Sequence, residues 1–181
     1  DKKFVEKYAT KKVNFGFNGL GEITYYRTYS RLKANGENEK WFETVERVVN
    51  GIYSIQKAHI LSQDLGWNEN KAQESAEEMY ERMFTFKFLP PGRGLWACGT
   101  DIIKKGLGAA MNNCGFVSTE GIDKNFIKPF TFMMDMSMLG VGVGFDVKGE
   151  GKLKVTKPTS TDKLPKDIVY PYVIPDTREG W

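Results

Sequence analysis

Two cysteines and one histidine have the most chemical capacity in this sequence. Cys98 and Cys114 are separated by fifteen residues, so the chain has neither a CxxC redox pair nor a four-cysteine zinc site. His59 is the only histidine, which excludes a site of several imidazoles and leaves a nucleophile one candidate base. Cys114, between Asn113 and Gly115, could exchange electrons with a partner cysteine, although a free cysteine on a strand is more often simply buried.

Alternate glycines at positions 140, 142 and 144 superficially resemble a dinucleotide-binding fingerprint. They follow a predicted helix, lead into a predicted strand, and have Phe145 where the last glycine belongs, so the order is reversed for a Rossmann turn. The sequence also lacks a P-loop. Glycines on a strand let a ligand or another backbone come close, so this strand could form the floor of a pocket for a bulky polar ligand.

Helices are predicted ahead of these residues. Apolar residues recur every three or four positions over 41–59, which indicates a helix of about five turns. We expect His59, near its C-terminus, to pack and to satisfy a carbonyl rather than to catalyse. Asn68 is a suitable N-cap for a second, antiparallel helix over 68–83, and the prolines and glycines of 89–94 predict a tight loop after it. Residues 1–32 predict an irregular packed segment.

The remaining pattern predicts strands alternating with a helix. Residues 112–118 are typical of a short buried strand that begins near Cys114, and residues 141–147 of a second strand. Between them, Pro129 fits the first position of a helix that ends at Gly140. Residues 152–155 predict an exposed strand, and the capping box at 176–179 predicts the start of a helix, which suggests a piece of a longer fold.

Composition limits the class of protein. The 181 residues are 40% hydrophobic, enough for one domain with a core. No apolar stretch is long enough for a membrane helix or placed as a secretory signal, so we expect a cytoplasmic protein without a membrane partner. The net charge of +3 is spread along the chain and favours no nucleic-acid partner. Arg27 and Arg31, among tyrosines, keep a single-stranded nucleic-acid binder as a minor hypothesis.

Six blocks in order resemble the N-terminal part of adenosylcobalamin-dependent ribonucleotide reductases, particularly the monomeric ribonucleoside-triphosphate reductase type. The blocks are residues 25–31, 41–51, 89–96, 112–117, 140–145 and 174–181. Together they run through nearly the whole chain. The resemblance implies an α/β fold in which residues 1–88 form an N-terminal helical region. Residues 89–181 would then form the first part of a ten-stranded α/β barrel that is incomplete in this chain.

The resemblance also implies roles for individual residues. Cys114 matches one of two thiols that reduce the ribose 2′ carbon and become a disulfide, which thioredoxin later reduces. Asn113 and Gly142 match residues that line the site for the ribonucleoside triphosphate. Asp146 and Lys148 fall at the start of the region that binds a deoxynucleotide effector. No residue of this chain is expected to ligate a metal.

The same resemblance implies that much of the enzyme lies elsewhere. The radical-forming cysteine, the second redox cysteine and most of the adenosylcobalamin site would belong to a C-terminal reductase chain or segment. We therefore expect this chain to be inactive alone. The alternative is a non-catalytic nucleotide-binding or regulatory module of the same family, which would bind a deoxynucleotide whether or not Cys114 is present. Cys98 is expected only to pack in a loop.

Overall fold

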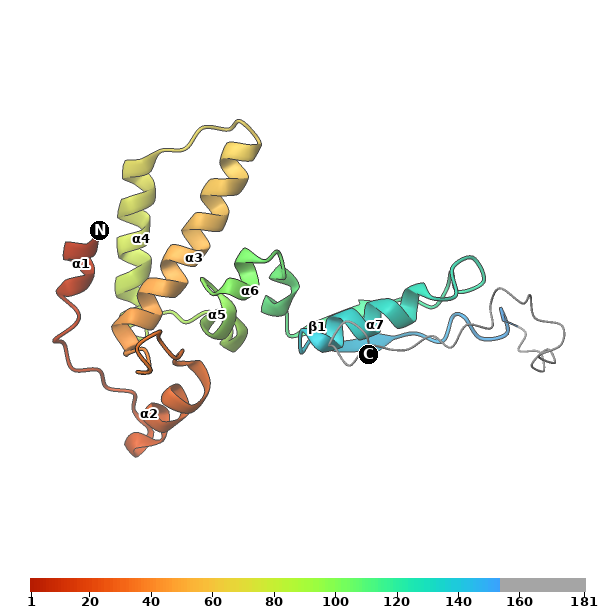
Figure 1. Cartoon of the computed structure of the whole chain (residues 1–181), viewed down its shortest axis with the longest axis horizontal. Coiled ribbons are helices and arrows are strands. Elements are labelled where there is room, and N and C mark those ends of the chain that lie inside the picture. Colours follow the sequence, from red (N-terminus) through yellow and green to blue (C-terminus); the bar gives the residue numbers. More distant parts are fainter. Residues whose placement is uncertain (154–181) are drawn as a thin grey trace.

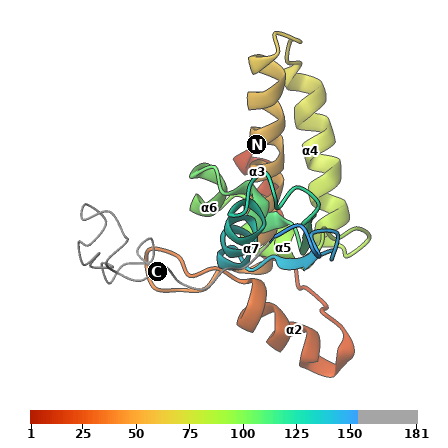
Figure 2. The same cartoon turned by 90° about the vertical axis from the view of Figure 1, so that its right-hand side faces the viewer.

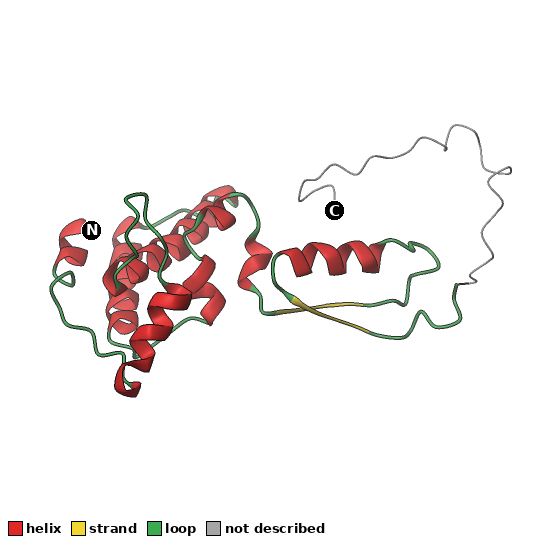
Figure 3. Ribbon diagram, turned by 60° about the horizontal axis from the view of Figure 1, so that its bottom comes forward, coloured by secondary structure: helices red, strands yellow, loops and turns green. Residues whose placement is uncertain are grey.

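The computed structural model describes residues 1–153, which form a mostly helical assembly with one pair of parallel strands (Figures 1 and 3). The helices are α1 (Lys2–Glu6), α2 (Leu20–Thr24), α3 (Trp41–Ser62), α4 (Glu69–Phe84), α5 (Gly92–Ala97), α6 (Asp101–Lys104) and α7 (Lys128–Met138). Shorter turns of 3-10 or π geometry are η1 (Phe17–Gly19), η2 (Tyr25–Tyr29) and η3 (Gly108–Met111), and the strands are β1 (Cys114–Val117) and β2 (Gly142–Phe145).

Helices α3 and α4 pack side by side as an antiparallel pair, which confirms both predicted helices (Figures 1 and 2). Val45 and Val48 of α3 and Met83 of α4 are fully buried. Each such side chain stabilises the fold by about 1.5–3 kcal/mol relative to an exposed position. Asn68 caps α4 as predicted, because its side chain accepts a hydrogen bond from Lys71 N at 3.0 Å. This helix pair is the main core of the described part of the chain.

The first 32 residues contain short helices and turns, so the prediction of an irregular segment was wrong in this respect. Their aromatic side chains pack on the helix pair: the Tyr8 ring lies 4.8 Å from that of Phe84, and the Tyr25 ring 5.3 Å from that of Trp41. These contacts are between buried rings, and they hold elements that are too short to be stable alone. Aromatic packing rather than helix propensity therefore orders this segment.

The expectation for His59 was also wrong. Helix α3 continues past it to Ser62, and the side chain is exposed instead of packed. The buried residues of α3 all lie in its N-terminal half, and its last turns extend past the elements that pack on it. Burial of the apolar stripe of this helix is confined to residues such as Val45 and Val49.

Residues 89–94 do not form only a loop, because α5 begins at Gly92. Pro91 takes the extended backbone of an N-cap, a position where proline and the glycine after it do not break a helix. Leu95 and Ala97 are buried, and Cys98 directly after the helix is 1% exposed. Tertiary burial thus stabilises a short helix that the proline and glycine content conceals.

Strands β1 and β2 pair in parallel, with α7 connecting them and covering one face (Figure 3). Pro129 lies in the first turn of α7, as predicted. The prediction of a buried first strand was wrong, since Cys114 and Phe116 are exposed. The reason is that no other described element covers the second face of this strand pair. Lys152 and Leu153 are not in a strand, and the rest of the predicted 152–155 strand and the 176–179 helix start lie outside the described residues.

Candidate functional site

The first residues of β1 and β2 bring together the predicted thiol and substrate residues. Cys114 is the register partner of Gly142, and the Asn113 carbonyl accepts a hydrogen bond from Gly142 N at 2.9 Å. All three residues are exposed. A Cβ atom added to Gly142 would meet only the Asn113 carbonyl, at an ordinary 3.7 Å, so the strand itself does not require glycine there. What the missing side chain provides is open surface beside the thiol.

The two cysteines have opposite surroundings, and both are free thiols. Cys98 is buried against α3, where its Sγ lies 3.6 Å from the Val48 carbonyl as a weak donor. Burial raises the pKa of the Cys98 thiol, and the nearby Arg47 guanidinium only partly offsets that effect. Because the thiolate is the reactive form, Cys98 is the inert thiol and Cys114 the accessible one.

Asp146 lies at the opposite end of the strand pair, directly after β2. Its carboxylate accepts hydrogen bonds from the Ser118 hydroxyl at 2.7 Å, and from the Thr119 hydroxyl and backbone N–H at 2.7 and 2.8 Å. These donors, the Ser118 hydroxyl first, hold the pKa of Asp146 well below its usual range. The carboxylate therefore ties the end of β2 to the end of β1. Sequence reasoning missed Thr119, which is 27 residues away and has no local signal.

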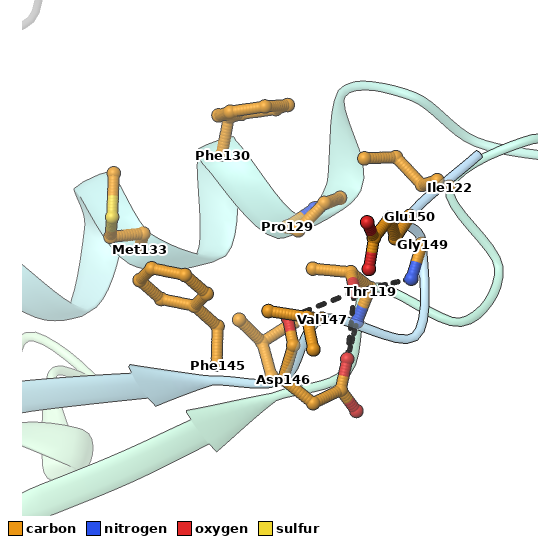
Figure 4. A pocket seen from close by; sticks show the side chains of 11 residues that line it. Thr119, Ile122, Pro129, Phe130, Met133, Phe145, Asp146, Val147, Gly149 and Glu150 are labelled. Atoms are coloured by element: carbon orange, nitrogen blue, oxygen red, sulfur yellow. Dashed lines mark hydrogen bonds between the residues drawn. The ribbon is translucent and has the colours of Figure 1, made fainter. Parts of the chain in front are cut away.

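A pocket of about 600 Å³ lies beside this end of the strands (Figure 4). Pro129, Phe130 and Met133 of α7 and Phe145 of β2 give it an apolar wall. Asp146 also lines it, but in Figure 4 its carboxylate points away from Phe130 and Met133. The lining residues do not include Lys148, the other predicted effector residue, which is exposed and lies 3.8 Å from a Glu120 carboxylate oxygen.

The structure therefore separates the predicted residues into two groups. Asn113, Cys114 and Gly142 meet where the strands begin, and Asp146 and Lys148 lie where they end. Within residues 1–153, no group of three or more His, Cys, Asp or Glu residues could hold a metal ion. No helix in this same range is long and apolar enough to cross a membrane.

Fold and site together define a helical region that leads into a parallel βαβ unit with an exposed thiol at its first strand residue. The sequence profile described as "Ribonucleotide reductase alpha domain" matches residues 1–100, and the chain belongs to this family.

Similar proteins identify the branch of the family. The chain is 54% identical to a "Probable adenosylcobalamin-dependent ribonucleoside-triphosphate reductase" of Dictyostelium discoideum, over 99% of this chain and 25% of the relative. It is 51% identical to the adenosylcobalamin-dependent ribonucleoside-triphosphate reductase of Euglena gracilis, over 100% of this chain and 24% of the relative. The chain thus spans about a quarter of the length of these curated relatives.

A solved structure supports the same assignment. The crystal structure of a B-12 dependent (class II) ribonucleotide reductase matches with a TM-score of 0.65 and 33% sequence identity, over 80% of this chain and 22% of that chain. The chain is therefore a homologue of the adenosylcobalamin-dependent ribonucleoside-triphosphate reductases that matches an N-terminal portion of them, as the six sequence blocks predicted.

Proposed function

We propose that the chain forms the N-terminal part of an adenosylcobalamin-dependent ribonucleoside-triphosphate reductase, in which Cys114 is one of two thiols that reduce the ribose 2′ carbon. The observation that carries the proposal is the exposed Cys114 thiol at the start of β1, with the open surface of Gly142 beside it. Relatives named for this activity support it. In this proposal residues 1–88 are the helical region, and residues 89–181 begin a ten-stranded α/β barrel whose first βαβ unit is β1, α7 and β2.

The proposed step transfers two electrons. Cys114 and a second thiol, which the proposal places outside this chain, lose one hydrogen each and form an S–S bond. The C2′–O bond breaks, one hydrogen goes to C2′, and the other leaves with the hydroxyl as water. The dithiol is oxidised and the ribose is reduced. Thioredoxin then reduces the disulfide with its own dithiol, which restores Cys114 for the next turnover.

Asn113 and Gly142 have positioning roles in this proposal. The Asn113 carbonyl accepts a hydrogen bond from Gly142 N, and the residues after Cys114 pair with β2. The backbone is therefore fixed on both sides of the thiol. The Asn113 side chain is exposed and could donate to the nucleotide, while the absent side chain at Gly142 lets the ribose approach the thiol. A thiol on a strand is held more precisely than one on a loop, which a two-thiol reaction needs.

Adenosylcobalamin, when bound, supplies the radical that starts the reaction. His59, the one imidazole in the sequence, is exposed in the last turns of α3. In this proposal most of the adenosylcobalamin site belongs to the C-terminal reductase chain or segment, as the resemblance implies.

We assign the deoxynucleotide effector to the end of the strand pair that carries Asp146 and Lys148. Lys148 is exposed and could pair with a phosphate, and its present partner Glu120 is at a loose 3.8 Å. Asp146 cannot offer a free carboxylate, because its oxygens already accept from Ser118 and Thr119. Its role in this proposal is to shape the loop that Lys148 belongs to.

The experiment is Cys114→Ser in a reductase reassembled from this chain and its C-terminal partner. We expect multiple turnover with thioredoxin to be abolished and cobalamin binding to be unchanged. Cys98→Ala is the matched control, because it removes the buried thiol and should preserve turnover. Undiminished turnover of Cys114→Ser refutes the role of Cys114. If the isolated chain binds a deoxynucleotide equally with and without Cys114, and reassembly gives no turnover, the regulatory-module alternative is correct.

A further inference from the structure

The position of Cys114 relative to Gly142 depends on contacts outside the strands. Each strand has four residues, and within the described part of the chain they pair only with each other. Helix α7 packs on one face of the pair, as such a small unit requires for stability. That packing leaves open the point at which β2 begins, and a small shift there would move Gly142 along Cys114.

Arg93 of α5 reaches that point. Its Nη1 donates to the Leu139 carbonyl at 3.0 Å, and its Nη2 donates to the Gly140 carbonyl. These two carbonyls belong to the turn between α7 and β2, just before Gly142. A planar guanidinium can bind two neighbouring acceptors at once, which fixes the orientation of the turn as well as its place.

The turn is built for this close approach. Gly140 has a φ of +76°, a conformation that L residues with side chains rarely adopt. A Cβ atom added there would lie 2.9 Å from both terminal nitrogens of Arg93. After this turn, Val141 is 4% exposed and its N–H donates to the Met136 carbonyl at 2.9 Å. Gly142 N then donates to the Asn113 carbonyl. Residues 140–142 are thus each held by a hydrogen bond, up to the position beside the thiol.

Helix α5 is itself anchored to the helical region. Arg47 of α3 donates to the Leu95 carbonyl at 3.0 Å and to the Cys98 carbonyl at 2.5 Å. The Glu39 carboxylate orients Arg47 through a bond of 2.8 Å to its Nε. Two arginines thus connect the buried helix pair to the start of β2.

We propose that Arg93 is a positioning residue for Cys114: it holds the turn before β2 so that Gly142 stays in register beside the thiol. The proposal rests on the proposed function only for the consequence in catalysis. The geometric part concerns this chain alone and is measurable without activity.

The first test is amide hydrogen exchange on the chain with Arg93→Lys. Lysine keeps the charge but has a single nitrogen in place of the planar fork that holds the two carbonyls in fixed directions. We therefore expect the Gly142 amide to exchange about tenfold faster, the factor that one lost bond to a charged donor implies. Exchange in α3 and α4 should not change. The matched control is Arg82→Lys, which makes the same substitution at an exposed ion pair with Glu78 and should leave Gly142 unaffected.

The second test is the reassembled reductase carrying Arg93→Lys. We expect kcat to fall about tenfold or more and the KM for the ribonucleoside triphosphate to stay within about twofold, because misplacing a reacting group lowers the rate rather than binding. Unchanged exchange at Gly142, or faster exchange with unchanged kcat, overturns the inference. Loss of protection throughout α3 and α4 also overturns it, since Arg93 would then be a general folding residue.

These outcomes are separable from failure of the proposed function. If Cys114→Ser keeps full turnover, the proposed function fails whatever Arg93 does. If Cys114→Ser abolishes turnover while Arg93→Lys changes neither exchange nor kcat, only the positioning inference fails.

Discussion

Replacing Arg47 by methionine should be among the most destabilising single changes on the surface of α3 that faces α5. Arg47 and Glu39 are bonded at 2.8 Å with side chains only 12% and 10% exposed. A second bond joins Arg47 Nη2 to the other carboxylate oxygen at 3.1 Å. Arg47→Met removes both bonds and the two donations to the Leu95 and Cys98 carbonyls.

The expected cost follows from what is left behind. The Glu39 carboxylate would keep the Thr44 hydroxyl at 2.8 Å and the Arg31 backbone N–H at 3.3 Å, but it would be buried without the cation that bonds it directly. Breaking a buried ion pair in this way costs about 3–5 kcal/mol, against a total of about 5–15 kcal/mol for an ordinary domain. Adding Glu39→Gln to Arg47→Met removes the buried carboxylate that has lost its directly bonded partner. We expect the double variant to regain about 1–3 kcal/mol relative to Arg47→Met.

Four proteins are compared: the unmodified chain, Arg47→Met, Glu39→Gln and the double variant. Urea unfolding followed by tryptophan fluorescence and circular dichroism measures their free energies of unfolding. Arg82→Met is the control, because its ion pair with Glu78 is 60% and 65% exposed and should contribute about 1 kcal/mol or less. A loss below about 1 kcal/mol for Arg47→Met would refute the reasoning. So would a double variant less stable than Arg47→Met.

Three further predictions concern other parts of the chain. Gly99→Ala should lower the free energy of unfolding by more than about 2 kcal/mol, because the new Cβ would lie 2.3 Å from an α3 carbonyl oxygen. The control is Gly106→Ala, which has a similar positive φ but open space around it and should cost about 1 kcal/mol; urea unfolding measures both. Folding lowers the pKa of Asp146, so the contribution of this carboxylate to stability is present above its unfolded pKa near 4 and is lost as the pH falls towards its folded pKa. The free energy of unfolding should therefore change less between pH 6 and pH 3 in Asp146→Asn than in the unmodified chain. Iodoacetamide should alkylate Cys114 in the native chain while Cys98 stays protected, as peptide mass spectrometry would show, and equal labelling would contradict the burial of Cys98.

The long elements were predictable because their signals are local. The apolar repeat over 41–59 and the Asn68 cap indicate α3 and α4 without any knowledge of the rest of the chain. The same holds for Pro129 at the start of α7. Helix α5 was missed because proline and glycine conceal its first turn, and its stability comes from burial of Leu95 and Ala97 against distant residues.

Of the candidate site, sequence reasoning named only the residues at the start and end of the strands. Asn113, Cys114 and Gly142 belong to sequence blocks that resemble a known family, and parallel pairing of the two strands then places them together. Arg93 and Thr119 were not identifiable, because their partners are 46 and 27 residues away and no periodicity links them. Polar contacts between distant segments leave no pattern in a single sequence, so only the folded chain reveals them.

The central claim is that Cys114 is oxidised as the ribose is reduced. The most direct measurement is the redox state of Cys114 after a single turnover of the reassembled reductase without thioredoxin, by differential alkylation and peptide mass spectrometry. The account predicts that one Cys114 enters a disulfide for each deoxynucleotide formed, and that Cys98 remains a free thiol. Deoxynucleotide formation with Cys114 still fully reduced would contradict it.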